Sequence, residues 1–144
     1  MVEKTFNILF VCRHNRFRSK FAESYFKKIN KNKNIKTQSA GIFPGPSTIN
    51  KLEIKVSNEL KVTLSGKPKP VKTKLLNWNN LIVLITNDVP NPHKLFNYAT
   101  FKNKVITWKI KDSNWESITQ MRGIVNEIKK EIDKLNQNLK KFNS

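Results

Sequence analysis

The hydrophobic residues of this chain follow two alternating patterns. Two runs of strand length, 6–11 and 81–86, are almost continuously apolar, and 104–110 is a third run with β-branched residues near its centre. Runs of this kind predict strands that are covered on both faces, as in the middle of a parallel sheet. The segment 35–41 (IKTQSAG) predicts a further short strand that ends at a glycine.

Helical spacing of apolar residues marks three other segments, 19–29, 49–60 and 118–142. In each of them the apolar residues recur every three or four positions and therefore share one side of a helix. The stripe in the last segment is long enough to be typical of a coiled coil as well. A single helix that follows a series of strand and helix units more often packs on a sheet, and we expect that arrangement here.

Strands that alternate with helices predict an α/β protein. We expect a three-layer sandwich in which a four-stranded parallel sheet carries helices on both faces. A chain of 144 residues with 38 % hydrophobic residues is long enough for a single domain with a buried core. The domain therefore spans 1–144, and we expect 135–144 to fray because these residues are rich in Asn and Lys.

The chain is strongly basic, with 28 Lys and Arg against 10 Asp and Glu and a formal net charge of +18. This charge favours an anionic partner, which could be a phosphate group, nucleic acid or an acidic membrane surface. Only four of the basic residues are Arg, and a solvated lysine-rich surface accounts for most of the charge. The charge therefore does not choose among these partners.

Cys12 is the only cysteine, which excludes an internal disulfide, a CxxC redox pair and a zinc site built from several cysteines. The spacing of His, Asp and Glu indicates no metal site, so we expect neither a metal nor a cofactor. The apolar runs are far shorter than the roughly 20 residues of a membrane span, and the first residues do not resemble a secretory signal. We therefore expect a cytoplasmic protein.

The candidate chemistry is concentrated where the first predicted strand meets the first predicted helix. There Cys12, Arg18 and Ser19 form the motif C-x5-R-S within VCRHNRFRS. A loop of five residues can curl around one tetrahedral oxyanion, with backbone N–H groups and the helix N-terminus pointing at it. The same surroundings stabilise a thiolate, and an arginine can bind two phosphoryl oxygens at once. The alternative is that Cys12 is an inert buried thiol and Ser19 a helix cap.

The segment 8–24 (ILFVCRHNRFRSKFAES) resembles the low-molecular-weight protein tyrosine phosphatase family and its arsenate reductase relatives. The likeness continues through SAG at 39–41 and NDVP at 87–90 to the strand that leads to Asp112. It therefore covers nearly the whole chain in order.

The resemblance implies a role for each residue of the motif. Cys12 would attack phosphorus, Arg18 would bind the phosphoryl group, and Ser19 would steady the thiolate. Asn15 would hold the loop in shape through Ser39, and an asparagine suits this position because it tolerates a left-handed backbone.

Several positions depart from the family pattern. Phe17 replaces the second loop cysteine of many eukaryotic members, and Lys20 replaces a proline. The related arsenate reductases pass electrons through two further cysteines, which this chain lacks. We expect the substrate to be bound by the loop, by the SAG element and by two aromatic walls: Arg13, His14, Asn15, Arg16, Phe17, Ser39, Phe43 and Trp115.

Cleavage of a phosphate ester also needs an acid that protonates the leaving oxygen. The resemblance assigns this role to Asp112, although Ser113 stands where the family has a proline. A capping box of Ser113 and Glu116 would instead make Asp112 a helix-end residue. Asp88 also follows a predicted strand and is a competing candidate for the acid.

These residues favour a cysteine-dependent phosphomonoester hydrolase, a protein tyrosine phosphatase that works through a phosphocysteine intermediate. One alternative is an oxyanion reductase of the arsenate reductase type that uses an external thiol. Another is a non-catalytic domain that binds phosphate or nucleic acid, although the chain lacks the interleaved aromatic residues typical of nucleic-acid readers. The expected partner is a phosphorylated protein or a small phosphomonoester, with inorganic phosphate as product, and the expected state is a monomer or weak dimer.

Overall fold

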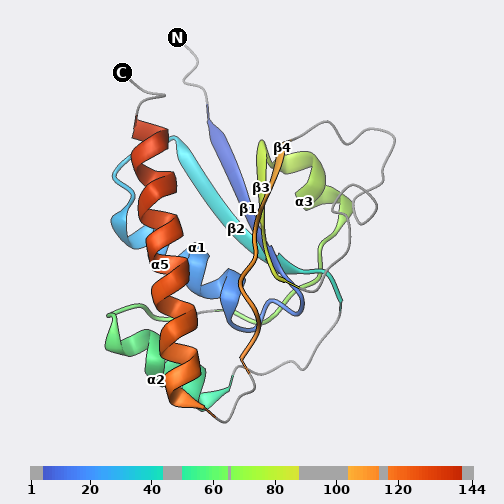
Figure 1. Ribbon diagram of the computed structural model, residues 1–144. Helices are drawn as coiled ribbons and strands as arrows, with labels where there is room; N and C mark the ends of the chain where they lie inside the picture. The colour runs from blue at the N-terminus through green and yellow to red at the C-terminus, as the bar shows by residue number, and fades with distance from the viewer. Residues whose placement is uncertain (1–4, 44–49, 65, 88–103, 114–116, 141–144) are drawn as a thin grey trace.

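The computed structural model describes residues 5–43, 50–64, 66–87, 104–113 and 117–140 of the chain. The described elements, in chain order, are β1 (Phe6–Cys12), α1 (Arg18–Ile29), β2 (Ile35–Gly41), α2 (Lys51–Glu59), α3 (Thr73–Trp78), β3 (Leu81–Ile85), β4 (Lys104–Trp108) and α5 (Ile118–Lys140). Every predicted strand and helix is present, and the boundaries differ by a few residues (Figure 1).

The four strands form one parallel sheet in the order β2-β1-β3-β4. The predicted four-stranded parallel sheet is therefore confirmed. The register pairs Cys12 with Gly41 and Val11 with Leu84, so the carboxyl ends of the central strands meet at one edge of the sheet. Ligands of open α/β sheets bind at this edge.

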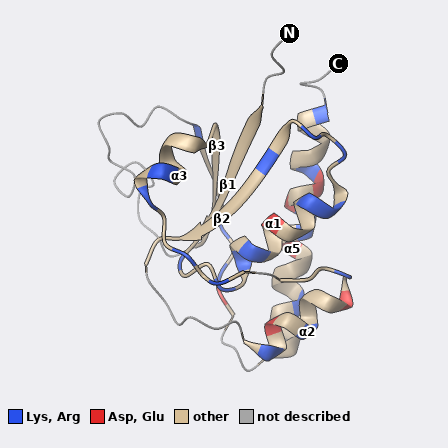
Figure 2. Cartoon of the chain, turned by 180° about the vertical axis from the view of Figure 1, so that it is seen from behind, with Lys and Arg blue, Asp and Glu red and all other residues tan. Residues whose placement is uncertain are grey.

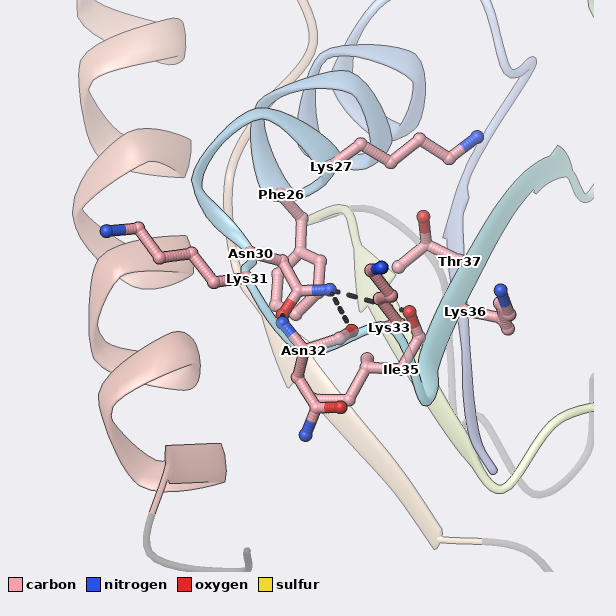
Figure 3. A pocket seen from close by; sticks show the side chains of 9 residues that line it. All are labelled: Phe26, Lys27, Asn30, Lys31, Asn32, Lys33, Ile35, Lys36 and Thr37. Carbon is pink, nitrogen blue, oxygen red and sulfur yellow. Dashed lines mark hydrogen bonds between the residues drawn. The ribbon is translucent and has the colours of Figure 1, made fainter. Parts of the chain in front are cut away.

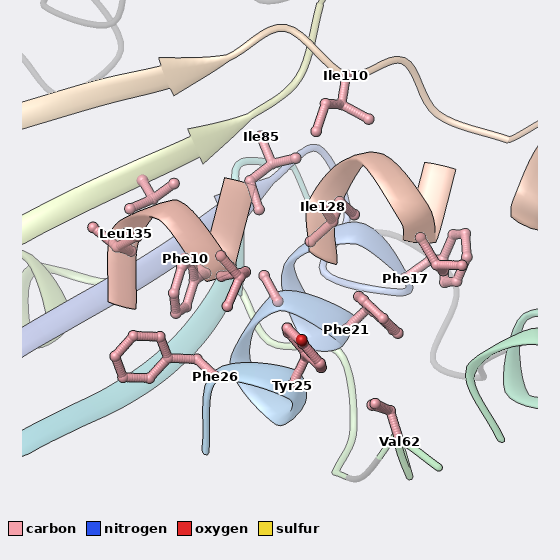
Figure 4. Close-up of a cluster of buried hydrophobic side chains, with 14 of the residues drawn as sticks. Phe10, Phe17, Phe21, Tyr25, Phe26, Val62, Ile85, Ile110, Ile128 and Leu135 are labelled. Atoms are coloured by element: carbon pink, nitrogen blue, oxygen red, sulfur yellow. The ribbon is translucent and has the colours of Figure 1, made fainter. Parts of the chain in front are cut away.

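Helices cover both faces of the sheet, as predicted. On β1, Ile8 and Phe10 join the large apolar cluster beneath α1, α2 and α5, whereas Leu9 and Val11 join a smaller cluster beneath α3. The apolar run of β1 is continuous because both of its faces are buried. Figure 4 shows the large cluster, in which Phe10 lies among side chains of α1 and α5.

Helix α5 packs as a single helix against α1 and the sheet, in agreement with the prediction. The buried residues of α5 recur every three or four positions along its length: Met121, Ile124, Val125, Ile128, Ile132, Leu135 and Leu139. The hydroxyl of Tyr25 on α1 donates a hydrogen bond of 2.7 Å to Oδ1 of Asp133 on α5. The helix continues to Lys140, and Leu135 and Leu139 are still buried against the core.

The sequence pattern did not predict α3, which has only six residues. Two turns are too short for a helical repeat of apolar residues to stand out. Leu76 of this helix is buried, and Trp78 packs against the smaller cluster. None of the described helices is long and apolar enough to cross a membrane.

Candidate functional site

Cys12 lies at the carboxyl end of β1, in the middle of the sheet. The loop 13–17 follows it, and α1 begins at Arg18, so the structure has the strand, loop and helix that the motif predicts. The thiol is buried, with 2 % of the residue exposed. Because the N-terminus of α1 faces the loop, its partial positive charge favours an anion or a thiolate at this position.

Within the described part of the chain, two groups hydrogen-bond to the sulfur of Cys12. The backbone N–H of Asn15 donates a hydrogen bond to Sγ at 3.3 Å, and the hydroxyl of Ser19 lies 3.0 Å from Sγ. The Ser19 oxygen already accepts a hydrogen bond of 2.7 Å from Nδ2 of Asn15, which leaves its own proton to point at the sulfur. Both contacts therefore suit a thiolate.

Asn15 shapes the loop, but through other partners than the sequence predicted. Its backbone is left-handed, with φ of 57°, and its Oδ1 accepts a hydrogen bond of 3.0 Å from the N–H of Lys69. The hydroxyl of Ser39 instead donates to Oε1 of Glu23 on α1 at 2.6 Å. The predicted link between Asn15 and Ser39 is thus wrong, because Ser39 lies two residues before the end of β2 and is satisfied by the helix above it.

Gly41, which ends β2, allows the loop to approach the sheet. A Cβ atom at this position would lie 2.6 Å from the backbone carbon of His14 and 2.8 Å from the backbone nitrogen of Asn15. Just beyond it, the N–H groups of Ile42 and Phe43 donate to the carbonyls of Cys12 and Arg13 at 3.0 and 2.9 Å. The glycine of the SAG element is therefore required by the close backbone contact.

The guanidinium of Arg18 is oriented from the far side of the pocket. Its Nη1 donates a hydrogen bond of 2.8 Å to the carbonyl of Ile110, and its Nη2 lies 3.5 Å from Oδ2 of Asp112. The residue is 1 % exposed, and its Nε is buried without a hydrogen-bond partner among the described residues. An unsatisfied buried donor of this kind is suited to an incoming phosphoryl oxygen.

Asp112 follows β4 and faces the pocket. One of its oxygens lies near Arg18, and Oδ1 accepts a hydrogen bond of 2.9 Å from the N–H of Ser113. Helix α5 begins at Ile118, and the hydroxyl of Ser117 accepts a bond of 3.1 Å from the N–H of Gln120 in its first turn. Ser117 thus caps the first turn of α5. Glu116, the partner of Ser113 in the predicted capping box, lies outside the described residues.

The remaining loop side chains spread over the rim and the core. The guanidinium of Arg13 lies 5.6 Å from the ring centre of Phe43, which is 47 % exposed, and Nδ1 of His14 lies 3.3 Å from the Phe43 carbonyl. Phe17 lines the pocket and also belongs to the large apolar cluster. Trp115 and the competing acid Asp88 lie outside the described residues.

Lys20 brings a positive charge to the buried side of the loop. Burial lowers the pKa of Lys20, and the nearby carboxylate of Glu23 opposes this effect. The residue stands where the family usually has a proline, in the first turn of α1. A lysine at this point adds to the positive potential around Cys12.

Glu53 of α2 was missed by the sequence analysis. It is buried and lines the pocket together with Cys12, His14, Arg16, Phe17, Arg18 and Asp112. Its Oε1 lies 4.0 Å from Nη2 of Arg16. The sequence carries one signal for this residue, because Asn50 and Glu53 have the spacing of a capping box, but that signal concerns only the start of α2.

A larger hollow lies at the other end of β2, away from Cys12. It measures about 600 Å³ and is lined by the last turns of α1 and the first residues of β2: Phe26, Lys27, Asn30, Lys31, Asn32, Lys33, Ile35, Lys36 and Thr37 (Figure 3). Lysine and arginine also occur on all the described helices (Figure 2). Across the described ranges, no group of three or more His, Cys, Asp and Glu residues could hold a metal ion.

A sequence model of the family described as low molecular weight phosphotyrosine protein phosphatase matches residues 7–144. No curated protein matches the sequence.

Several solved structures share the fold. The YwlE arginine phosphatase from Geobacillus stearothermophilus is 21 % identical, with a TM-score of 0.81 over 94 % of each chain. The low molecular weight protein tyrosine phosphatase from T. tengcongensis is 22 % identical, with a TM-score of 0.80 over 93 % of this chain and 99 % of its own. The arsenate reductase from Archaeoglobus fulgidus is 24 % identical, with a TM-score of 0.70 over 90 % of this chain and 98 % of its own.

At these identities the likeness to the solved structures concerns the fold. The family model extends further, because it spans nearly the whole chain and includes the motif from Cys12 to Ser19. This chain therefore belongs to the low molecular weight phosphotyrosine protein phosphatase family.

Proposed function

We propose that this protein is a cysteine-dependent phosphomonoester hydrolase that acts on phosphotyrosine in proteins. The observation that supports it most is that Cys12, Arg18 and Asp112 line one small pocket at the carboxyl end of the sheet. A nucleophile, an anion-binding fork and an acid are the groups that this reaction needs. Nothing in this reaction requires a metal or an organic cofactor.

In the first step, the thiolate of Cys12 attacks phosphorus. The S–P bond forms while the bond from phosphorus to the ester oxygen breaks, and Asp112 gives its proton to the leaving oxygen. Arg18, held by the carbonyl of Ile110, binds the phosphoryl oxygens as charge shifts toward them. The product of this step is a phosphocysteine and a free phenol.

In the second step, water attacks the phosphocysteine, and the Asp112 carboxylate takes a proton from it. The S–P bond breaks and inorganic phosphate leaves. The returning thiolate is stabilised by the hydroxyl of Ser19 and the N–H of Asn15, which contact the sulfur at 3.0 and 3.3 Å. Division into two steps replaces one difficult displacement by two easier ones.

Phosphoarginine is a second candidate substrate. Some of the similar structures are arginine phosphatases, and the described lining of the pocket includes the carboxylates of Glu53 and Asp112. A phosphorylated guanidinium carries several N–H donors, which carboxylates accept well. Against this, Glu53 already has Arg16 beside it.

Arsenate reduction is a less favoured activity. The arsenate reductases among the similar structures share the fold, but Cys12 is the sole cysteine of this sequence. Each turnover would therefore require an external thiol that supplies the electrons for the reduction and is itself oxidised.

The thiol on which the proposed reaction depends would stay reduced in a reducing compartment, and we therefore propose a cytoplasmic location. For the oligomeric state, we expect a monomer or weak dimer.

Hydrolysis by the wild-type protein and by Cys12→Ser tests the proposal. The wild type should release phosphate from p-nitrophenyl phosphate and from a phosphotyrosine peptide, whereas Cys12→Ser should lose turnover of both, because a serine hydroxyl is not ionised in this loop. The variant should keep its fold and still bind phosphate.

Two further substrates separate the other candidates. If phosphoarginine is turned over faster than phosphotyrosine, phosphoarginine is the better candidate for the substrate. If the protein reduces arsenate with an added thiol but hydrolyses neither ester, it is a reductase and not a phosphatase. If Cys12→Ser retains more than a few per cent of the activity, Cys12 is not the nucleophile.

A further inference from the structure

One carboxylate of the pocket has no part in the steps above. Glu53 on α2 is 1 % exposed and lines the pocket with Cys12, Arg18 and Asp112. A buried carboxylate costs free energy unless hydrogen bonds or an opposite charge compensate it. The contacts of Glu53 therefore indicate what it does.

Glu53 connects three segments that are distant in sequence. Its Oε1 accepts a hydrogen bond of 3.3 Å from the N–H of Asn50 and lies 4.0 Å from Nη2 of Arg16. Its Oε2 accepts a hydrogen bond of 3.4 Å from the hydroxyl of Ser113. The bond to Asn50 belongs to the capping box of α2, which uses only one of the two oxygens. The other contacts join the loop 13–17, called the phosphate loop from here on, to the segment after β4.

Ser113 links Glu53 to the proposed acid. While its hydroxyl donates to Glu53, its backbone N–H donates a hydrogen bond of 2.9 Å to Oδ1 of Asp112. The other oxygen of Asp112 faces Nη2 of Arg18 at 3.5 Å. Among the described residues, these two contacts orient the carboxylate of Asp112, whose side chain is 37 % exposed.

The position of Glu53 is unfavourable for its charge. Burial raises the pKa of Glu53 to about 7, against the lowering effect of Arg16 and with a further raising effect of Asp112. A neutral side chain at the same place on α2 would avoid this cost of burial. The carboxylate is therefore better explained by the contacts that it makes at the pocket than by the stability of the helix.

We propose that Glu53 is a positioning residue of the phosphatase site, which holds Ser113, and through it Asp112, where the leaving oxygen can be protonated. Arg16 steadies the carboxylate from the side of the phosphate loop. The role rests on the proposed function, because it concerns the acid of that reaction. Glu53 acts through Asp112 and does not itself donate the proton.

Two esters with different leaving groups test this role. A displaced acid matters most when the leaving group is poor. Glu53→Ala should therefore lower kcat for a phosphotyrosine peptide about tenfold, with KM little changed, while kcat for p-nitrophenyl phosphate changes less than about twofold. Glu59→Ala is the matched control, since Glu59 lies on the same helix but pairs with Arg122 at the surface, and it should leave both esters unchanged.

A double-mutant cycle separates positioning from a general loss of structure. In an Asp112→Asn background, Glu53→Ala should cause no further loss with phosphotyrosine, because the group through which it acts is already gone. Ser113→Ala breaks the same link without touching α2 and should reproduce the tenfold effect. Glu53→Gln keeps an oxygen acceptor for Ser113 and should recover most of the activity, even if Glu53→Ala folds poorly.

The outcomes distinguish this role from the function on which it rests. The role of Glu53 would be overturned if Glu53→Ala lowered kcat equally for both esters or caused a further loss in the Asp112→Asn background. The proposed phosphatase function would still stand in that case, provided that hydrolysis by the wild type depends on Cys12. A wild type that hydrolyses neither ester would overturn the phosphatase and the role of Glu53 together.

Discussion

The two ends of the sheet carry hollows of opposite character. At the carboxyl end, the pocket around Cys12 is closely filled, with about 10 Å³ left free among side chains that are mostly buried. At the amino end of β2, a hollow of about 600 Å³ is lined by four lysines and three asparagine or threonine side chains. Among the described residues, the larger and more basic hollow has no cysteine in its lining.

The difference lies in how the charges are held. Arg18 is bonded to the Ile110 carbonyl and faces Asp112, so its guanidinium is fixed before any ligand arrives. Lys27, at the other end, has a side chain that is 59 % exposed and pairs with Glu23 on its own helix. Donors that are buried and oriented in advance stabilise a transition state, whereas solvated lysines give a diffuse attraction. Charge and volume alone therefore do not identify the site.

Replacing the fixed arginine should have the largest effect on this comparison. Arg18→Lys should reduce kcat for p-nitrophenyl phosphate about 10³–10⁴-fold, because a point charge cannot form two parallel hydrogen bonds to the phosphoryl group. Steady-state kinetics would measure it, with Arg122→Lys as the control, since Arg122 is a surface residue paired with Glu59. If Arg18→Lys unfolds the protein but its folded fraction keeps normal activity, Arg18 is structural.

Replacing the acid should have the next largest effect. Asp112→Asn should lower kcat for phosphotyrosine by about 10²-fold or more, and that for p-nitrophenyl phosphate much less, because the nitrophenolate leaves without a proton. The pH–rate profile of the wild type should fall on its basic side, where the acid loses its proton, and the profile of Asp112→Asn should lack this fall. Equal and small effects on both esters would transfer the acid role to Asp88, and Asp88→Asn would then show the discrimination.

A third prediction concerns stability at the carboxyl end. Burial raises the pKa of Glu53 from 4.5 to about 7, so between these pH values the folded protein keeps a proton that the unfolded chain releases. This group therefore makes stability fall as pH rises through that window. Glu53→Gln should raise the free energy of unfolding by up to about 3 kcal/mol at pH 8 and leave it unchanged at pH 4.

Urea denaturation at the two pH values would measure the difference. Glu59→Gln is the control with the opposite sign, because the hydrogen bond from Arg122 lowers the pKa of Glu59 and its removal offers no gain at pH 8. If Glu53→Gln adds no stability at pH 8, the contacts of the Glu53 carboxylate compensate the free-energy cost of its burial. That result would argue against a trade-off in which a charge that destabilises the fold is kept at this pocket because catalysis needs it.

The smallest effect is expected at the amino end. The double substitution Lys31→Gln and Lys33→Gln removes two of the lysines around the larger hollow. It should change kcat/KM for p-nitrophenyl phosphate by less than about twofold, because solvated charges at this distance from Cys12 are screened by salt. A loss of tenfold or more at physiological ionic strength would mean that this end contributes to the reaction.

The elements of the sheet could be predicted because each reflects a local pattern. The continuous apolar run of β1 and the helical repeat of α5 are visible without knowledge of their neighbours, since burial on one or both faces selects for them. The short helix α3 has no such repeat and could not be seen. The phosphate loop was equally visible, because all its parts lie within eight residues of Cys12.

Contacts between distant segments followed a different rule. The sequence predicted that Ser39 would support Asn15, yet the tertiary structure brings Lys69 to Asn15 and Glu23 to Ser39. The partners of these two residues depend on how α1 and the 66–70 segment pack against the loop and the strand. A list of motif residues does not contain that choice.

The sequence by itself therefore determined the α/β class, the strand that ends at Cys12 and the loop that follows, because these depend on periodicity and on short spacing. Only the tertiary structure placed Glu53 beside Arg16 and Ser113, which lie 37 and 60 residues away along the chain. Sheet order and helix packing set such contacts, and they arise from the burial of all the elements together. A glutamate in a capping box looks the same in sequence whether it faces water or an active site.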